Sequence, residues 1–188
     1  MWDLATGKSV AEFDPFAGTK PTLDTGLYKP TVATLAFSPD GKTLAAHINF
    51  FDDELPRFDH MQIWDLPSGK LRATFDGKAC LFTPDGETLI SGCKGQVELR
   101  STRTLAVLAT LKGTTEISPG DLSRDGKTIV AIGNDKTIQL WDLSQRKLSA
   151  VLKGHDRAIT AVAISPDGNT LASGREDGSI WLWNSDPP

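Results

Sequence analysis

Hydrophobic residues in this chain gather in short runs separated by stretches of Gly, Pro, Asp and Ser. The last quarter shows the pattern clearly, with apolar runs at 159–164, 170–174 and 179–183 on either side of polar turns. Runs of this length with this punctuation are typical of β-strands. In the first run, Val162 and Ile164 fall on one face of a strand, and the alternate residues on the other face are apolar too. We therefore predict a strand that is buried on both sides.

One turn sequence recurs four times, as SPDGKT at 38–43, TPDGET at 83–88, SRDGKT at 123–128 and SPDGNT at 165–170. Pro sets φ for the first turn position, Asp suits the second, and Gly accepts the positive φ that follows. Arg124 replaces the proline of the third copy, which weakens that turn without changing its type. The glycines of successive turns are 45, 40 and 42 residues apart, so the chain consists of repeated units.

Each unit has the sequence of four short strands, which we name a to d in chain order. Strand d follows the third strand at 9–13, 71–75, 105–111 and 148–152. Four antiparallel strands in about 40 residues are typical of a β-propeller, in which four-stranded blades surround a common axis. The sequence therefore predicts an all-β protein, a β-propeller with about four blades in this chain.

These units resemble the WD-repeat (Trp-Asp repeat) β-propeller family over essentially the whole chain. The resemblance lies in a dipeptide that closes strand c, and in one Gly-His pair before a strand a: Trp2–Asp3, Trp64–Asp65, Trp141–Asp142, Trp183–Asn184 and Gly154–His155. A single Trp-Asp dipeptide carries no weight, but its recurrence together with the repeated turns is a strong signal. The resemblance implies a ring of seven or eight blades.

The resemblance also implies a buried hydrogen-bond network, whose full set of residues occurs in the last unit alone. Asp177 is expected to hold His155, and His155 to meet Ser173. Ser173 is expected to meet the indole N–H of Trp183, because such a chain stabilises a blade only if every member is satisfied. The same Ser, His and Asp could suggest a hydrolase triad, but Ser173 lies in a strand without a strained turn to expose it. We interpret the set as framework.

The other units depart from this network. In the third unit, Asp135 and Trp141 match, whereas Ala131 replaces the Ser and Thr114 replaces the His. In the second unit, Arg100 stands at the Trp position. These departures weaken individual blades but leave the predicted fold unchanged.

The predicted blades span 31–75, 78–112, 115–153 and 158–184, and the last lacks its strand d. Residues 1–13 contain a spare strand d, which in the family commonly completes the last blade and so removes unpaired edges. Four blades fall short of the implied ring, and three interpretations stay open. The chain is a piece of a longer propeller, or two chains form an eight-blade homodimer, or the chain is a strained four-blade monomer.

Two connections in the first unit are longer than their equivalents. Residues 14–30 join strand d to the next strand a, and residues 50–60 join strands b and c. In a propeller these connections emerge on the same face, so we predict that both contribute to one partner-binding rim. The predicted binding residues are Tyr28, Lys29, Phe50, Phe51, Asp52, Asp53, Glu54, Arg57, Phe58, Asp59 and His60.

Aromatic and Arg anchors surrounded by acidic groups suit a protein or peptide partner, and a basic one by charge complementarity. The plainer interpretation is that Phe50 and Phe58 pack the connection onto its blade while the acidic residues are solvated. A metal site would use Asp52, Asp53, Asp59 and His60, but their spacing matches no recognised loop, so we predict none.

No nucleophile or cofactor motif stands out, so we predict no catalytic residues and no cofactor. His47 on strand b is expected to be a packed core histidine, and Cys80 and Cys93 to be inert thiols on neighbouring strands. With two cysteines in 188 residues, neither a disulfide framework nor a four-ligand metal site is available.

The net charge of −4 argues against a nucleic-acid or anionic-membrane binder, because no basic stripe exists to neutralise phosphates. No apolar run approaches the length of a membrane span, and the default compartment is the reducing cytoplasm. Two functions remain: a non-catalytic protein-interaction scaffold, or the propeller domain of a larger enzyme or signalling protein with catalysis elsewhere in the parent chain.

Overall fold

The computed structural model describes residues 2–3, 5, 8–9, 29–51 and 58–184. Every element of regular secondary structure in these ranges is a β-strand, which confirms the predicted all-β class. Each sheet is antiparallel with its strands in chain order, as expected of propeller blades.

Four sheets follow one another along the chain, and we number them as blades. Blade 1 contains β3 (Lys29–Phe37), β4 (Thr43–Phe51), β5 (Phe58–Asp65) and β6 (Lys70–Asp76). Blade 2 contains β7 (Lys78–Phe82), β8 (Thr88–Cys93), β9 (Gln96–Ser101) and β10 (Val107–Leu111). Blade 3 contains β11 (Ile117–Leu122), β12 (Thr128–Gly133), β13 (Ile138–Asp142) and β14 (Lys147–Leu152). Blade 4 contains β15 (Ile159–Ile164), β16 (Thr170–Arg175) and β17 (Ile180–Asn184).

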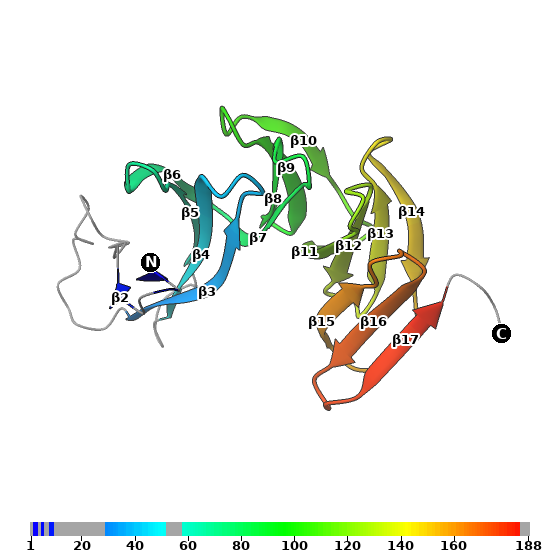
Figure 1. Cartoon of the computed structure of the whole chain (residues 1–188). Coiled ribbons are helices and arrows are strands. Elements are labelled where there is room, and N and C mark those ends of the chain that lie inside the picture. Colours follow the sequence, from blue (N-terminus) through cyan, green and yellow to red (C-terminus); the bar gives the residue numbers. More distant parts are fainter. Residues whose placement is uncertain (1, 4, 6–7, 10–28, 52–57, 185–188) are drawn as a thin grey trace.

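The blades stand side by side in an arc, with strands a on its concave side and strands d on its convex side (Figure 1). Contacts between neighbouring blades run through strands a, from β3 to β7, from β7 to β11 and from β11 to β15. A propeller has this arrangement because its first strands surround the common axis.

The repeated turns join strands a and b, and they explain the regular spacing. In the first of them the Ser38 hydroxyl donates to Asp40 Oδ1 over 2.6 Å, and the same carboxylate oxygen accepts from the backbone N–H of Lys42 over 3.0 Å. Gly41 has a φ of 69°, a conformation that strains a residue with a side chain. The hydrogen bond from Ser38 lowers the pKa of Asp40 below its usual value. The other three turns repeat this geometry, with Thr83 replacing the serine of the second.

Apolar residues fill the spaces between blades. Three buried clusters join successive blades: Ala45, Met61, Ile63, Cys80 and Leu89 between blades 1 and 2; Ile90, Val97, Leu99, Leu111, Ile117, Ile129, Ala131 and Trp141 between blades 2 and 3; and Val130, Ile138, Ile159 and Leu171 between blades 3 and 4. Each blade is therefore buried on the faces that meet a neighbour. The prediction that the strand at 159–164 is buried on both sides was wrong. Val162 and Ile164 pack against blade 3, but Ala161 and Ala163 on the other face are exposed, because no described blade lies beside them.

The pairing register is the same in every blade and identifies equivalent positions. On strand c, the residues that pair with the second residue of strand b are Trp64, Arg100, Trp141 and Trp183. The expectation that Arg100 replaces a tryptophan therefore agrees with the register.

Among the residues that the structure describes, none of residues 1–13 pairs with blade 4, the position expected for them. Strand β1 (Trp2–Asp3) pairs with β2 (Lys8–Ser9), whereas β17 pairs with β16 alone among the strands that the structure describes. The β1–β2 pair lies at the blade 1 end of the arc, opposite from β17 (Figure 1). Residues 10–13, the main part of the expected strand, lie outside the described residues.

Candidate functional site

The two long connections of the first unit are partly strands rather than loops. Lys29 and Pro30 extend β3 and pair with Phe51 and Phe50, and Phe50 also pairs with Phe58 across β4 and β5. Blade 1 is therefore taller than the others, and the ends of the two insertions lie in one sheet. The predicted b–c connection at 50–60 is shorter in the structure, because both of its ends continue the strand ladder, as far as Phe51 on β4 and from Phe58 on β5.

The eleven predicted binding residues fall into three groups. Tyr28, Asp52, Asp53, Glu54 and Arg57 lie outside the described residues. The structure places Lys29, Phe50, Phe51 and Phe58 in strands without describing their side chains. Asp59 and His60 are described in full, and both lie at the start of β5.

Asp59 and His60 each face a polar partner. The imidazole of His47 donates through Nε2 to Asp59 Oδ1 over 3.1 Å, while Thr34 Oγ1 lies 3.4 Å from His47 Nδ1. His47 is 8% exposed, as expected of a core histidine. His60 Nδ1 lies 3.6 Å from Asp76 Oδ1. Within the part of the chain that the structure describes, no group of three His, Cys, Asp or Glu residues is placed to hold a metal ion.

A groove opens beside these two pairs, on the face where b–c and d–a connections emerge. Its first part is a hollow of about 500 Å³, lined by Asp59, His60, Asp76, Gly77, Lys78, Gly92, Cys93, Lys94, Gly95 and Glu116. Its second part, about 300 Å³, shares Lys78, Gly95 and Glu116 with the first and continues to Ile117, Ser118, Ile132, Gly133, Asn134, Lys136, Ala158 and Ile159. We call the two parts together the rim groove. It crosses from blade 1 to blade 4.

Glycines keep the rim groove open. A Cβ on Gly95 would lie 2.6 Å from the side chain of Glu116, and one on Gly77 would lie 2.9 Å from that of Met61. Lys94 and Gly95 both have positive φ, of 49° and 73°, which gives the tight b–c hairpin of blade 2 its shape. Side chains at these glycines would fill the hollow or displace its walls.

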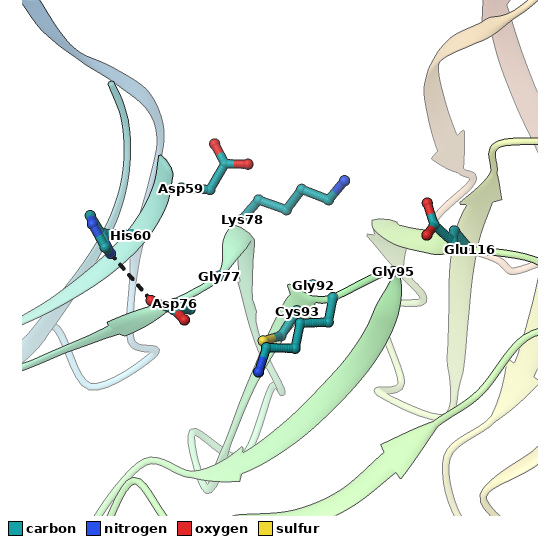
Figure 2. Close-up of a pocket in the computed structure, with 10 residues that line it drawn as sticks. Asp59, His60, Asp76, Gly77, Lys78, Gly92, Cys93, Gly95 and Glu116 are labelled. Atoms are coloured by element: carbon teal, nitrogen blue, oxygen red, sulfur yellow. Dashed lines mark ion pairs between the residues drawn. The ribbon is translucent and has the colours of Figure 1, made fainter. Parts of the chain in front are cut away.

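The charges of the rim groove are mixed. Asp59 and Lys78 project into the opening from one side and Glu116 faces them from the next blade (Figure 2). The charged residues of its described lining, apart from His60, are the carboxylates Asp59, Asp76 and Glu116 and the ammonium groups of Lys78, Lys94 and Lys136. The sequence analysis did not predict four of these residues, which lie in blade 2, in blade 3 or in the connections that lead to them: Lys78, Lys94, Glu116 and Lys136. The sequence feature that could have identified them is their position, since each lies at a b–c or d–a connection and these connections emerge on one face.

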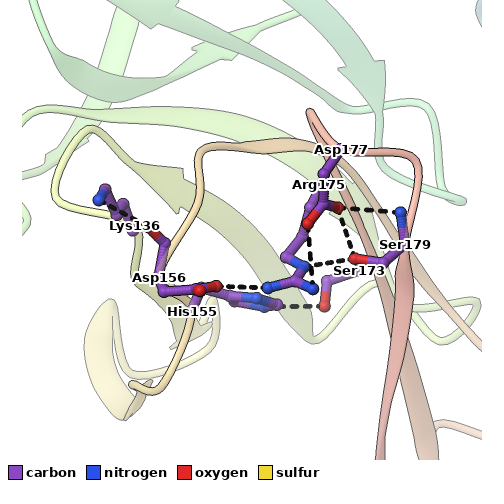
Figure 3. Close-up of polar contacts among 7 residues, drawn as sticks. All are labelled: Lys136, His155, Asp156, Ser173, Arg175, Asp177 and Ser179. Carbon is purple, nitrogen blue, oxygen red and sulfur yellow. Dashed lines mark hydrogen bonds and ion pairs between the residues drawn. The ribbon is translucent and has the colours of Figure 1, made fainter.

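The expected network of the last unit is present except for one contact. His155 Nε2 lies 3.0 Å from Ser173 Oγ (Figure 3). The indole N–H of Trp183 donates to the same oxygen over 2.9 Å. Ser173 is fully buried, so it cannot act as a nucleophile on a substrate.

The expected contact between Asp177 and His155 was wrong. Asp177 accepts hydrogen bonds from the Ser179 hydroxyl and backbone, and its other carboxylate oxygen lies 3.3 Å from Arg175 Nη2. His155 Nδ1 has no hydrogen-bond partner among the described residues. The guanidinium of Arg175 also pairs with Asp156, and Arg175 rather than His155 is the partner of Asp177 (Figure 3). The same guanidinium lies 4.8 Å from the ring centre of Trp181. Burial, followed by the positive charge of Arg175, lowers the pKa of His155.

The third blade shows what the replacements cost. Thr114 Oγ1, in the place of the histidine, accepts from Gln139 Nε2 over 3.0 Å. Trp141 Nε1 and Gln139 Oε1 are buried without a hydrogen-bond partner in the described structure. The missing hydroxyl at Ala131 accounts for the unpaired indole.

Both cysteines are free, and Cys80 is buried. Burial raises the pKa of the Cys80 thiol to about 11 and also raises the pKa of Cys93. Neither thiol therefore has the lowered pKa of a reactive cysteine.

Comparison with known proteins identifies repeats in this chain. The family described as "WD domain, G-beta repeat" matches residues 106–142 and 146–184. These two segments are WD repeats, as the resemblance implied. Among curated WD-repeat relatives, it is 44% identical over 57 residues to the small ribosomal subunit protein RACK1y of Oryza sativa subsp. japonica, covering 30% of this chain and 17% of that protein.

Two further relatives match longer segments. The chain is 29% identical over 106 residues to the guanine nucleotide-binding protein subunit beta-5b of Danio rerio, covering 54% of this chain and 27% of that protein. It is 27% identical over 135 residues to the serine-threonine kinase receptor-associated protein of Bos taurus, covering 71% of this chain and 38% of that protein. The matched part of this WD-repeat chain thus spans less than half the length of each relative. Within the described ranges, no helix is long and apolar enough to cross a membrane.

Proposed function

We propose that this WD-repeat protein is a non-catalytic scaffold that binds a protein or peptide along the rim groove. The observation that carries the proposal is the continuity of the groove from blade 1 to blade 4. Its walls are turns held by the blade framework, which suits recognition of an extended segment by a rigid surface. The names of the relatives agree, since they describe a ribosomal subunit protein, a subunit of a guanine nucleotide-binding protein and a receptor-associated protein.

The chemistry of the groove favours a polar partner that carries charge. Asp76 is 72% exposed at its side chain and Asp59 is 37% exposed, so both carboxylates are available to a ligand cation. Lys78 and Lys94 offer equal positive charge nearby. A preference for a basic partner therefore depends on Asp52, Asp53 and Glu54, which add negative charge beside Asp59 in the sequence.

A second copy of the chain is a further proposed partner, which would complete the ring. Free cysteines suit a reducing compartment, and we place the protein in the cytoplasm. The alternative, a propeller domain within a larger enzyme or signalling protein, uses the same groove to bind and leaves catalysis to another domain.

The test uses fluorescein-labelled 15-residue peptides in three versions, rich in Lys and aromatic residues, in Glu and aromatic residues, or in Ser and aromatic residues. Fluorescence anisotropy should show the tightest binding for the Lys version, weakened by added salt. Glu116→Gln should weaken it about two- to five-fold, as expected for an exposed ion pair. Glu87→Gln is the matched control, because Glu87 lies on an a–b turn at the opposite end of blade 2. Equal effects of the two substitutions, or no binding of any peptide, would overturn the proposal.

Replacing Asp52, Asp53 and Glu54 together by Ser tests the basic preference separately. We expect the Lys and Glu peptides to bind with similar affinity to this variant, and its melting temperature to stay nearly unchanged. A large drop in melting temperature would show that the insertion is structural instead.

A further inference from the structure

The two parts of the rim groove differ in the kind of residue that lines them. The first part is lined by charged residues, a histidine, glycines and one cysteine, Cys93. The second part adds four apolar residues, which are Ile117, Ile132, Ala158 and Ile159. Protein interfaces place their anchor side chains in pockets of this kind, surrounded by a polar rim. The second part therefore suits the side chain that anchors a partner.

The apolar floor of the second part lies between blades that have described neighbours. Its residues come from the b–c hairpin of blade 2, from blade 3 and from the start of blade 4. Ile117 and Ile159 are 1% and 9% exposed, so they form the base of the pocket. Ile132 is half-buried and Ala158 is exposed, and these two supply the apolar surface that a ligand can still cover.

Hydrogen bonds hold the walls of the pocket in place. The backbone N–H of Ile117 donates to Gly95 O over 2.7 Å and joins blade 3 to the hairpin of blade 2. Lys136 Nζ donates to Asp156 O over 2.8 Å and joins blade 3 to the connection that precedes blade 4. A pocket whose walls are already fixed costs less conformational entropy to fill.

Lys78 lies where the two parts of the groove meet. It lines both parts, is half-buried, and makes no hydrogen bond or ion pair with a described residue. Its side chain projects into the opening, where Glu116 faces it from the next blade (Figure 2). Within the lining of the second part, the ammonium groups of Lys78 and Lys136 outnumber the single carboxylate, that of Glu116. The pocket therefore favours an anionic group next to the apolar one.

We propose that the second part of the rim groove binds an apolar side chain of the partner, with a neighbouring carboxylate paired to Lys78. A charged residue alone would leave the apolar surface of Ile132 and Ala158 in water, and an apolar residue alone would leave the Lys78 ammonium unpaired. Basic residues of the same partner would lie over Asp59 and Asp76 in the first part. The inference rests on the proposed function, because it divides the same peptide site into a polar part and an anchor pocket.

The experiment uses fluorescein-labelled peptides rich in Lys and Ser that differ only in a central pair: Leu-Glu, Ser-Glu, Leu-Ser or Leu-Lys. Fluorescence anisotropy with the full chain should show the tightest binding for the Leu-Glu peptide. Replacing its Leu by Ser should weaken binding about ten-fold, as expected when a large apolar side chain is no longer buried. Replacing its Glu by Ser should weaken binding about two- to five-fold, as for an exposed ion pair, and Lys at this place should weaken it further.

Two variants of the chain assign these differences to the pocket. Lys78→Met should remove the preference for Glu over Ser while the preference for Leu persists. Ala158→Trp should fill the pocket and remove the preference for Leu. Their matched controls are Lys42→Met on the a–b turn of blade 1 and Ala106→Trp on the c–d connection of blade 2, since both residues are exposed and lie outside the groove. Both controls should keep both preferences, and circular dichroism of each variant verifies that the strands are intact.

The outcomes separate the inference from the proposed function. Equal binding of the Leu-Glu and Ser-Glu peptides would overturn the inference, and so would equal binding of the Leu-Glu and Leu-Lys peptides. Either result leaves the proposed function standing, because the peptides still bind. An equal loss of the Leu preference in Ala158→Trp and Ala106→Trp would place the anchor outside the pocket and would also overturn the inference. Failure of every peptide to bind would overturn both.

Discussion

Ala131→Ser should stabilise the protein, although it places a polar group in a fully buried position. Ala131 occupies the register position of Ser173, and Trp141 that of Trp183. In blade 4 the serine oxygen lies 2.9 Å from the indole nitrogen, so the same geometry in blade 3 gives the indole N–H of Trp141 its missing acceptor. The new hydroxyl lies opposite Gln139 on the same face, where Gln139 Oε1 is buried without a donor among the described residues. One hydroxyl thus satisfies two buried groups.

The magnitude follows from the cost of leaving those groups unpaired. A buried unsatisfied polar group costs about 1–3 kcal/mol, and a new intramolecular hydrogen bond contributes about 0.5–1.5 kcal/mol net. Burial of the hydroxyl offsets part of the gain, so we expect the free energy of unfolding to rise by about 1 kcal/mol. For a chain of this size that raises the melting temperature by about 2–4 °C.

Urea unfolding and calorimetry of the full chain measure the effect, and a double-mutant cycle assigns it. In a Trp141→Phe background the indole N–H is absent, so Ala131→Ser should lose most of its benefit. A lower melting temperature for Ala131→Ser alone would refute the reasoning. So would an equal gain in both backgrounds, since the hydroxyl would then act through some other contact.

Three further predictions concern the other buried groups. Ser173→Ala should lower the free energy of unfolding by about 1–3 kcal/mol because it leaves the Trp183 N–H unpaired. Ser91→Ala, at the equivalent position in blade 2, should cost nothing in the same urea titration, because Ser91 Oγ is buried without a partner in the described structure. The lowered pKa of His155 means that the unfolded chain binds more protons between that pKa and 6.5, so stability should fall as pH drops through this window. Melting temperatures at pH 7.5 and pH 5 should therefore differ more for the native chain than for His155→Gln, and equal differences would contradict the assignment. With its pKa raised to about 11, Cys80 should resist iodoacetamide at pH 8 until urea unfolds the chain, and early alkylation of Cys80 seen by mass spectrometry would count against its burial.

The repeat period allowed the fold to be predicted because its signals are local. Each a–b turn is specified by a hydroxyl, an aspartate and a glycine within six residues, and the structure shows that Ser38, Asp40 and Gly41 act together there. Once turns are in place, strand alternation fixes which residues face a neighbouring blade. The position of Arg100 could also be predicted from local signals, because the number of residues between the a–b turn and Arg100 places it at the tryptophan position of strand c.

The rim groove could not be predicted because it is not local. Its walls come from d–a and b–c connections of different blades, and residues as far apart as Asp59 and Lys136 line its two parts. The sequence marks the two insertions in the first unit because they are long. Gly95 and Glu116 have no such length signal, only a position at a b–c or d–a connection, and they meet when the hairpin of blade 2 approaches the start of β11.

The wrong partner for Asp177 has a similar cause. Within the turn that joins β16 and β17, Asp177 has Ser179 as a donor two residues away, and Arg175 two residues before it. A local hydroxyl and a cation compete with the distant His155 at little entropic cost. The presence of Arg175 was the signal in the sequence, since an arginine beside the acid supplies a stronger, charge-assisted partner than a neutral imidazole.

Blade 2 shows that the repeat conserves a position rather than a side chain. Arg100 lies in the place of tryptophan, with its guanidinium 4.3 Å from the ring centre of Phe75 and an Nη1 donating to Leu105 O over 3.1 Å. It also pairs with Glu98, which is opposite Ser91 in the register. The guanidinium therefore replaces both functions of an indole, because it covers an apolar neighbour and donates to the polar groups around it. What it cannot supply is a donor aimed at the serine, and Ser91 Oγ accordingly has no hydrogen-bond partner in the described part of blade 2. The strands tolerate this exchange because Val97 and Leu99, on the same strand as Arg100, remain buried in the apolar cluster between blades 2 and 3.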